Sequence, residues 1–249
     1  MKKVTVLTLV LLFLISVSND VVAWVYPEHR KIALLAIQKL NAEQRALFDL
    51  LWVEARRGYE SRLTLSVIDT AQSLATTQLD FASWPAIAGD HSCSPSDMLK
   101  SVLHTKWILK VADVAARLDV DLKRSKNDSW YTNAIRDSDI RLQRADVDYA
   151  TRAGSNNVHF LLARHEIEIG LEKYLADCLM KGAPLNALAA YTWFHQSALV
   201  KAQRYANENL SAAQKSALIL ASLADEAFAL HFLEDAFAAG HIVGTWGNA

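Results

Sequence analysis

Glycine and proline are scarce in this sequence, with only 8 and 4 of them among 249 residues. Because these two residues end helices and form turns, their scarcity favours long uninterrupted elements. The sequence also lacks runs in which β-branched and polar residues alternate, which is the pattern of a half-buried strand. These absences together predict an all-α protein.

Apolar residues recur at helical spacing along most of the chain, as expected for a multi-helix bundle. The helical patterns cover residues 28–57, 96–118, 159–182, 184–210 and 211–240. We expect Ser211 to cap the last helix and Gly240 to end it. The polar stretch 122–157 is expected to be the most irregular part. No internal repeat or linker is visible, so residues 24–249 should form one domain.

Neither sign of charge is in excess, since the formal net charge is −1. A dedicated nucleic-acid-binding protein usually has a basic face, so no stable nucleic-acid partner is expected. An enzyme that uses metal ions in place of lysine and arginine could still act on nucleic acid. The sequence has only two cysteines, Cys93 and Cys178. They would form one disulfide in an oxidising compartment or remain two free thiols.

The first 23 residues have the pattern of a secretory signal peptide. Lys2 and Lys3 precede an apolar run, and the segment ends at the small residue Ala23. The alternative is a membrane anchor, but the run is short for a span of about 20 residues. We expect cleavage between Ala23 and Trp24, and a secreted or periplasmic protein.

The strongest pattern of polar residues is HxxxDxxxxxH at the apolar end of the last helix. His231 and Asp235 are four residues apart and would lie on one helical face, followed by His241 after Gly240. A charged carboxylate among apolar residues is costly unless it is satisfied, and a metal ion is one way to satisfy it. Imidazole and carboxylate are both zinc ligands. The alternative is a His–Asp pair that only packs and forms a hydrogen bond.

A second candidate group lies in residues 83–104. Asp90 is in a loop rich in glycine, serine and proline, and His104 follows 14 residues later in the next helix. A loop carboxylate and a helix histidine could share a metal ion, and His91 is an alternative ligand. Asp90 could equally be a turn residue and His104 a core histidine.

The ordered set of these residues resembles the superfamily of zinc-dependent phospholipases C and fungal single-strand-specific nucleases. That family is all-helical and holds three zinc ions in one cleft, one of them bound by the amino group and carbonyl oxygen of an N-terminal tryptophan. The matching positions here are Trp24, His29, Asp90, His104, His231, Asp235 and His241. The remaining histidines, His159, His165 and His195, match no family ligand and are expected on helix faces or in the core.

The resemblance implies a ligand set for each ion. Trp24 and His29 would hold one zinc, with Asp235 as a bridging ligand. The second zinc would take Asp90, His104, His231 and Asp235. His241 would be the first ligand of a third zinc, whose other family ligands would follow beyond Ala249, where this sequence stops. We therefore expect a fragment truncated at its C-terminus.

One further departure concerns spacing: His231 follows His104 by 127 residues, more than the family core needs, so an insertion is expected between them. The five-residue step from Trp24 to His29 resembles the nuclease branch. The absence of a basic face instead favours the phospholipase branch.

The function that the resemblance implies is hydrolysis of a phosphodiester by zinc-activated water, with Asp90 as the catalytic carboxylate. The preferred substrate is a phospholipid, cleaved as by a phospholipase C with peripheral contact to a membrane surface. The first alternative is a single-strand nuclease. The second is a non-catalytic secreted helical protein that binds a lipid or a partner.

Overall fold

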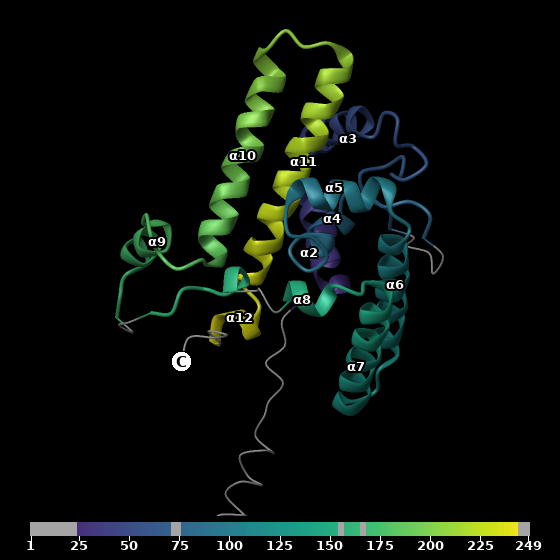
Figure 1. Ribbon diagram of the computed structural model, residues 1–249, viewed down its shortest axis with the longest axis vertical. Coiled ribbons are helices and arrows are strands. Elements are labelled where there is room, and N and C mark those ends of the chain that lie inside the picture. Colours follow the sequence, from purple (N-terminus) through teal and green to yellow (C-terminus); the bar gives the residue numbers. More distant parts are fainter. Residues whose placement is uncertain (1–23, 71–75, 154–156, 165–167, 244–249) are drawn as a thin grey trace, which may run out of the picture.

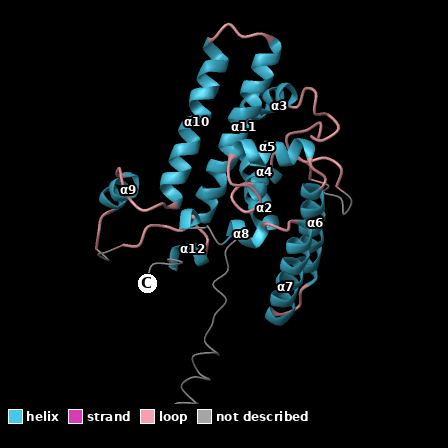
Figure 2. Ribbon diagram, viewed as in Figure 1, coloured by secondary structure: helices cyan, strands magenta, loops and turns pink. Residues whose placement is uncertain are grey.

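The structure is a computed structural model that describes residues 24–70, 76–153, 157–164 and 168–243. The predicted signal peptide, residues 1–23, and His165 lie outside these ranges. The described residues form helices and loops and no strand, apart from one isolated bridge between Leu63 and Leu79 (Figure 2). The prediction of an all-α multi-helix protein is confirmed.

The longest helix, α11 (Ala212–Asp235), is the centre of the fold. It runs antiparallel to α10 (Ala187–Asn207), and the two are joined by a short loop at one end of the molecule (Figure 1). From Ile219 onward α11 is buried on most of its circumference, because α2, α3, α4, α5 and α10 all pack on it. A helix that is apolar all round is expected to occupy such a central position.

The remaining helices surround this pair (Figure 1). Their bounds are α2 (Tyr26–Lys39), α3 (Ala42–Ala55), α4 (Ser83–Ile87), α5 (Pro95–His104), α6 (Trp107–Arg124), α7 (Asp128–Ala145), α8 (Tyr149–Ala153), the 3₁₀ turn η1 (Asn157–His159), α9 (Leu171–Leu179) and α12 (Ala239–Val243).

Length and composition alone would allow α11 to cross a membrane, and within the described part of the chain it is the one helix that passes this test. Its most apolar window is 61% buried inside the protein, which is the property of a core helix. The apolar surface of α11 is therefore used for packing against the other helices.

The predicted cap Ser211 is confirmed, and two further helices begin at side-chain caps. Asn41 accepts a hydrogen bond from the backbone N–H of Gln44 at the start of α3, and Ser211 does the same for Gln214 at the start of α11. In both cases the glutamine side chain returns a bond to the capping residue, which completes a capping box. At the start of α10, the side chain of Asn186 accepts a hydrogen bond from the backbone N–H of Ala189.

Other predictions of helix extent were wrong. The pattern over residues 96–118 is two helices, α5 and α6, and α5 begins one residue after its N-cap Ser94. The pattern over 159–182 contains the end of η1, then described residues that are not helical, and then α9. The last helix ends at Asp235 instead of Gly240, and His241 lies in the separate short helix α12. The apolar spacing continues on both sides of each break, so it did not reveal where one helix ends and the next begins.

The polar stretch 122–157 is more regular than predicted, since half of it forms the 18-residue helix α7. This helix pairs with α6 as a protruding hairpin (Figure 1). Only Ser138 and Leu142 of α7 are buried. A helix that buries so little has a weak apolar stripe, so its periodicity was not visible in the sequence.

Cys93 and Cys178 are both free thiols, Cys93 exposed and Cys178 buried, so the disulfide alternative is not realised in this structure.

Candidate metal centre

Asp235, the last residue of α11, lies at the centre of a buried group of histidines. Among the described residues, four imidazoles have a ring nitrogen close to its carboxylate. The distances are 3.5 Å for Nε2 of His29, 2.5 Å for Nδ1 of His159, 3.2 Å for Nε2 of His231 and 3.1 Å for Nδ1 of His241. All five side chains are buried. The fold therefore concentrates metal-ligating groups at one point.

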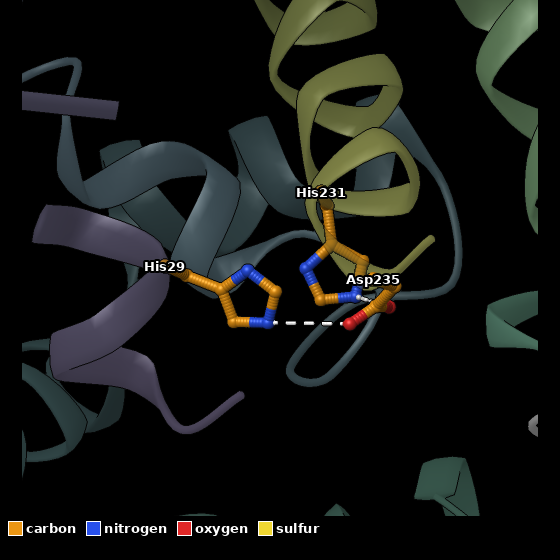
Figure 3. Close-up of side chains that lie close together, drawn as sticks. All are labelled: His29, His231 and Asp235. Carbon is orange, nitrogen blue, oxygen red and sulfur yellow. Dashed lines mark ion pairs between the residues drawn. The ribbon is translucent and has the colours of Figure 1, made fainter. Parts of the chain in front are cut away.

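The four histidines come from four different elements, α2, η1, α11 and α12, which meet at the C-terminal end of α11. They divide between the two oxygens of Asp235. Oδ1 faces His29 and His241, whereas Oδ2 faces His159 and His231. Figure 3 shows the carboxylate beside the rings of His29 and His231, which stack on each other with centroids 4.5 Å apart. A carboxylate in this position can bridge two ions.

Two groups of three side chains have ligand atoms within 4.8 Å of one another: His29, His231 and Asp235, and Asp90, His159 and His231. The two groups share His231, which has only Nε2 to offer. Its Nδ1 lies 2.9 Å from the carbonyl oxygen of Pro85 and must donate a proton to it. His231 can thus bind one ion, and the two groups are two neighbouring positions of one cluster.

The carboxylate of Glu234 orients His29, as the carbonyl of Pro85 orients His231. Nδ1 of His29 donates to Oε2 of Glu234 at 2.6 Å, which leaves Nε2 directed toward Asp235. An imidazole whose second nitrogen donates to a carboxylate or carbonyl is the usual arrangement of a metal-ligating histidine. Glu234 and Pro85 therefore fix the orientation of two ligands.

Trp24 lies against the same end of α11. Its indole Nε1 donates to the backbone carbonyl of Glu234 at 3.0 Å. This bond holds the start of the described chain against the residue that precedes Asp235 in α11. His29 follows one turn into α2. The structure thus brings Trp24 and His29 to the same side of the centre.

The loop after α4 places Asp90 beside His159 and His231, and Gly89 makes this possible. Gly89 has φ +71°, in the left-handed region, and a Cβ there would lie 2.8 Å from Cε1 of His159 and closer still to Nε2 of His231. Only glycine can occupy this position without displacing two candidate ligands.

The histidines and carboxylates of the cluster shift one another's pKa values. Burial opposes a charge on His231, but Asp235, Asp90 and Glu234 outweigh it and raise the pKa of His231 to about 9. Burial likewise opposes the charge of Asp235, yet the surrounding histidines hold the pKa of this carboxyl well below its usual value. At pH 7 His231 therefore carries a proton, which a metal ion would have to displace.

Burial also shifts the pKa values of His159 and Glu234. Burial lowers the pKa of His159, although its hydrogen bond to Asp235 acts in the opposite direction. Burial raises the pKa of Glu234, opposed by His29. A neutral imidazole is the form that binds a metal ion.

Two atoms of the cluster are buried without a hydrogen bond of acceptable geometry, Oδ1 of Asp235 and Nδ1 of His241. Buried polar atoms are normally paired, so such atoms require an explanation. Imidazole nitrogen and carboxylate oxygen are ligands of zinc and other divalent metals. The buried histidines and aspartates could accordingly hold a metal ion.

The structure places the predicted site residues unequally. It brings together Trp24, His29, Asp90, His231, Asp235 and His241. His104 is elsewhere: its side chain is exposed at the end of α5, and its ring centroid is 5.9 Å from that of Tyr59. The position expected for His104, beside Asp90 and His231, belongs to His159.

His159 was assigned to a helix face or the core because it matched no position of the resembled family. Its only signal in the sequence is the short polar segment that precedes it. Glu234 was also missed, although it lies three residues after His231, one helical turn further along α11. His91, the other candidate ligand, is turned away and pairs with Asp146 at 2.9 Å.

The comparisons with known proteins add no relative. No family model, no curated protein and no solved structure matches this chain. The centre is therefore characterised by its own geometry.

We predict that Gly89→Ala removes metal binding. The added methyl group would collide with His159 and His231, and the left-handed backbone would cost roughly 1–2 kcal/mol of stability. Gly58→Ala is the matched control, because Gly58 has φ +84° but nothing within 4 Å of its Cβ position. Thermal unfolding and metal analysis should show destabilisation in both variants and metal loss only in Gly89→Ala. Equal metal content in the two would refute the close approach.

Glu234→Gln should weaken metal binding by roughly 10- to 100-fold, because the partner that orients His29 loses its charge. Glu226→Gln is the control, since Glu226 also lies on α11 and pairs with a histidine, His195, at 2.8 Å. Competition with a coloured chelator measures both affinities. An equal effect of the two substitutions would show that Glu234 has no special role.

Proposed function

We propose that this protein is a zinc-dependent phosphodiester hydrolase. The observation that carries the proposal is the position of Asp235, whose two oxygens face different histidines within one buried cluster. Paired metal ions linked by a carboxylate are suited to phosphodiester cleavage. The order of Trp24, His29, His231 and Asp235 along the chain supports the same assignment through its resemblance to zinc-dependent phospholipases C and nucleases.

The residues divide between two ions as follows. Trp24, His29, Asp235 and His241 would hold one zinc. Asp90, His159, His231 and the shared Asp235 would hold the other. Zinc held there would lower the pKa of a bound water molecule to about 7 and would polarise the phosphoryl oxygens. His159 thus replaces His104 in the proposed ligand set.

The chain itself supplies orientation and proton transfer. Glu234 and the carbonyl of Pro85 keep Nε2 of His29 and of His231 directed at the centre. Asp90 is only half-buried, so a substrate bound at the surface of the cluster could contact its carboxylate. We assign to it the role of the carboxylate that orients the attacking water and accepts its proton.

The substrate that we propose first is a phospholipid, cleaved on the glycerol side of the phosphate. The net charge of −1 supports this choice, because a polyanionic substrate is usually met by a basic surface. A single-strand nuclease is the second candidate, favoured by the five-residue step from Trp24 to His29. Removal of residues 1–23 on export would free the α-amino group of Trp24 as a ligand.

Hydrolysis of phosphatidylcholine and of single-stranded DNA, each with and without a chelator, tests the proposal. We expect zinc-dependent release of the phosphorylated head group, no cleavage of DNA, and roughly 100-fold or greater loss of activity in Asp90→Asn. His104→Ala is the control and should keep full activity, since His104 is exposed outside the cluster.

Cleavage of DNA alone would select the nuclease. A zinc-loaded protein that cleaves neither substrate would contradict the proposed function and favour a binding protein.

A further inference from the structure

A second feature of the molecule is an apolar pocket between α2, α3 and α11, beside the candidate metal centre. Its volume is about 560 Å³, within the usual range for sites that bind small ligands. Apolar side chains form almost the whole wall, among them Ile32, Ile37, Phe48, Phe81, Leu223 and Leu230. This composition suits a hydrocarbon group and offers few partners to a polar ligand.

The mouth of the pocket remains apolar where it meets solvent. Phe237, which lines it, is 72% exposed. Ala36, on the α2 side, is exposed as well. Apolar surface that forms a concave site and stays in contact with water is characteristic of binding sites, because a ligand would remove that surface from water.

The ionisable groups of the lining are two carboxylates, Glu226 and Glu234. Each is paired with a histidine, Glu226 with His195 and Glu234 with His29. Among the residues that the structure describes, no lysine or arginine lines the pocket. A ligand with an anionic end would meet carboxylates and no cation, so the lining selects against fatty acids and favours a chain with an uncharged end.

The pocket adjoins the candidate metal centre. Trp24 and Glu234 line it, and Glu234 also holds His29 at 2.6 Å. The indole of Trp24 is fixed to the carbonyl of Glu234 at 3.0 Å. These two residues thus form the wall shared by the pocket and the centre, so a chain in the pocket would lie next to the metal ligands.

We propose that this pocket binds a single hydrocarbon chain with an uncharged polar end, as in a long-chain alcohol or a glyceride. The binding does not require the hydrolysis proposed above. It would hold an apolar ligand beside the metal centre, independently of whether a phosphodiester is cleaved there.

A series of 1-alkanols from hexanol to octanol, added to the metal-depleted and to the zinc-loaded full chain, tests the proposal by calorimetry. One alcohol should bind per chain, and the dissociation constant should fall about fourfold for each added methylene. The heat-capacity change of binding should be negative. Octanoate should bind more weakly than octanol, because of Glu226 and Glu234.

Ala36→Trp fills the pocket from an exposed helical position and should abolish binding of octanol. Ala46→Trp is the matched control, since Ala46 is also exposed on a helix but does not line the pocket. Both variants should unfold at similar temperatures and keep their zinc.

The proposal fails if octanol does not bind, if affinity does not change with chain length, or if the two variants bind equally. It also fails if sedimentation shows a dimer that Ala36→Trp dissociates, because a second copy would then cover the pocket. Octanol binding without phosphodiester hydrolysis would support the pocket and refute only the proposed function.

Discussion

The convergence of four histidines on the buried carboxylate of Asp235 is the interaction on which the rest of this structure depends. An ionised carboxylate without partners is expensive to bury. Here it is 1% exposed and is surrounded by His29, His159, His231 and His241. Since these histidines come from four elements, the cluster requires α2, η1 and α12 to meet at one end of α11.

The apolar helices around α11 supply the rigidity that such a cluster needs. α11 is buried among five other helices, and its last turn carries His231, Glu234 and Asp235 together. Sites built on packed helices hold ligands more precisely than sites on loops. The loop residue Gly89 then allows the backbone to approach His231 closely enough for Asp90 to join the group.

Local patterns made part of this centre predictable. His231 and Asp235 are one helical turn apart in an apolar helix, so their common face follows from helix geometry. His29 was proposed through the family resemblance, and Asp90 through its place in a polar loop before the next helix. The all-α fold and the cap Ser211 could also be predicted, because capping depends on neighbouring residues.

What could not be predicted depends on contacts between distant segments. From the sequence, either His159 or His104 could be a metal ligand. The packing of η1 against α11 decides that His159 is the residue near Asp235. The break between α11 and α12 was hidden because Ala236 and Ala238 are as buried as the helix itself. The position of His241 therefore required the structure.

Zinc analysis of Asp235→Asn is the measurement that tests the central claim most directly. Asparagine keeps the size of the side chain but removes the negative charge that all four histidines face. Asp225→Asn is the matched control, since Asp225 is also buried in α11 and pairs with Lys201. With both variants shown to be folded by circular dichroism, we predict that Asp235→Asn loses most of its zinc while Asp225→Asn keeps it. Full zinc content in Asp235→Asn would contradict the account.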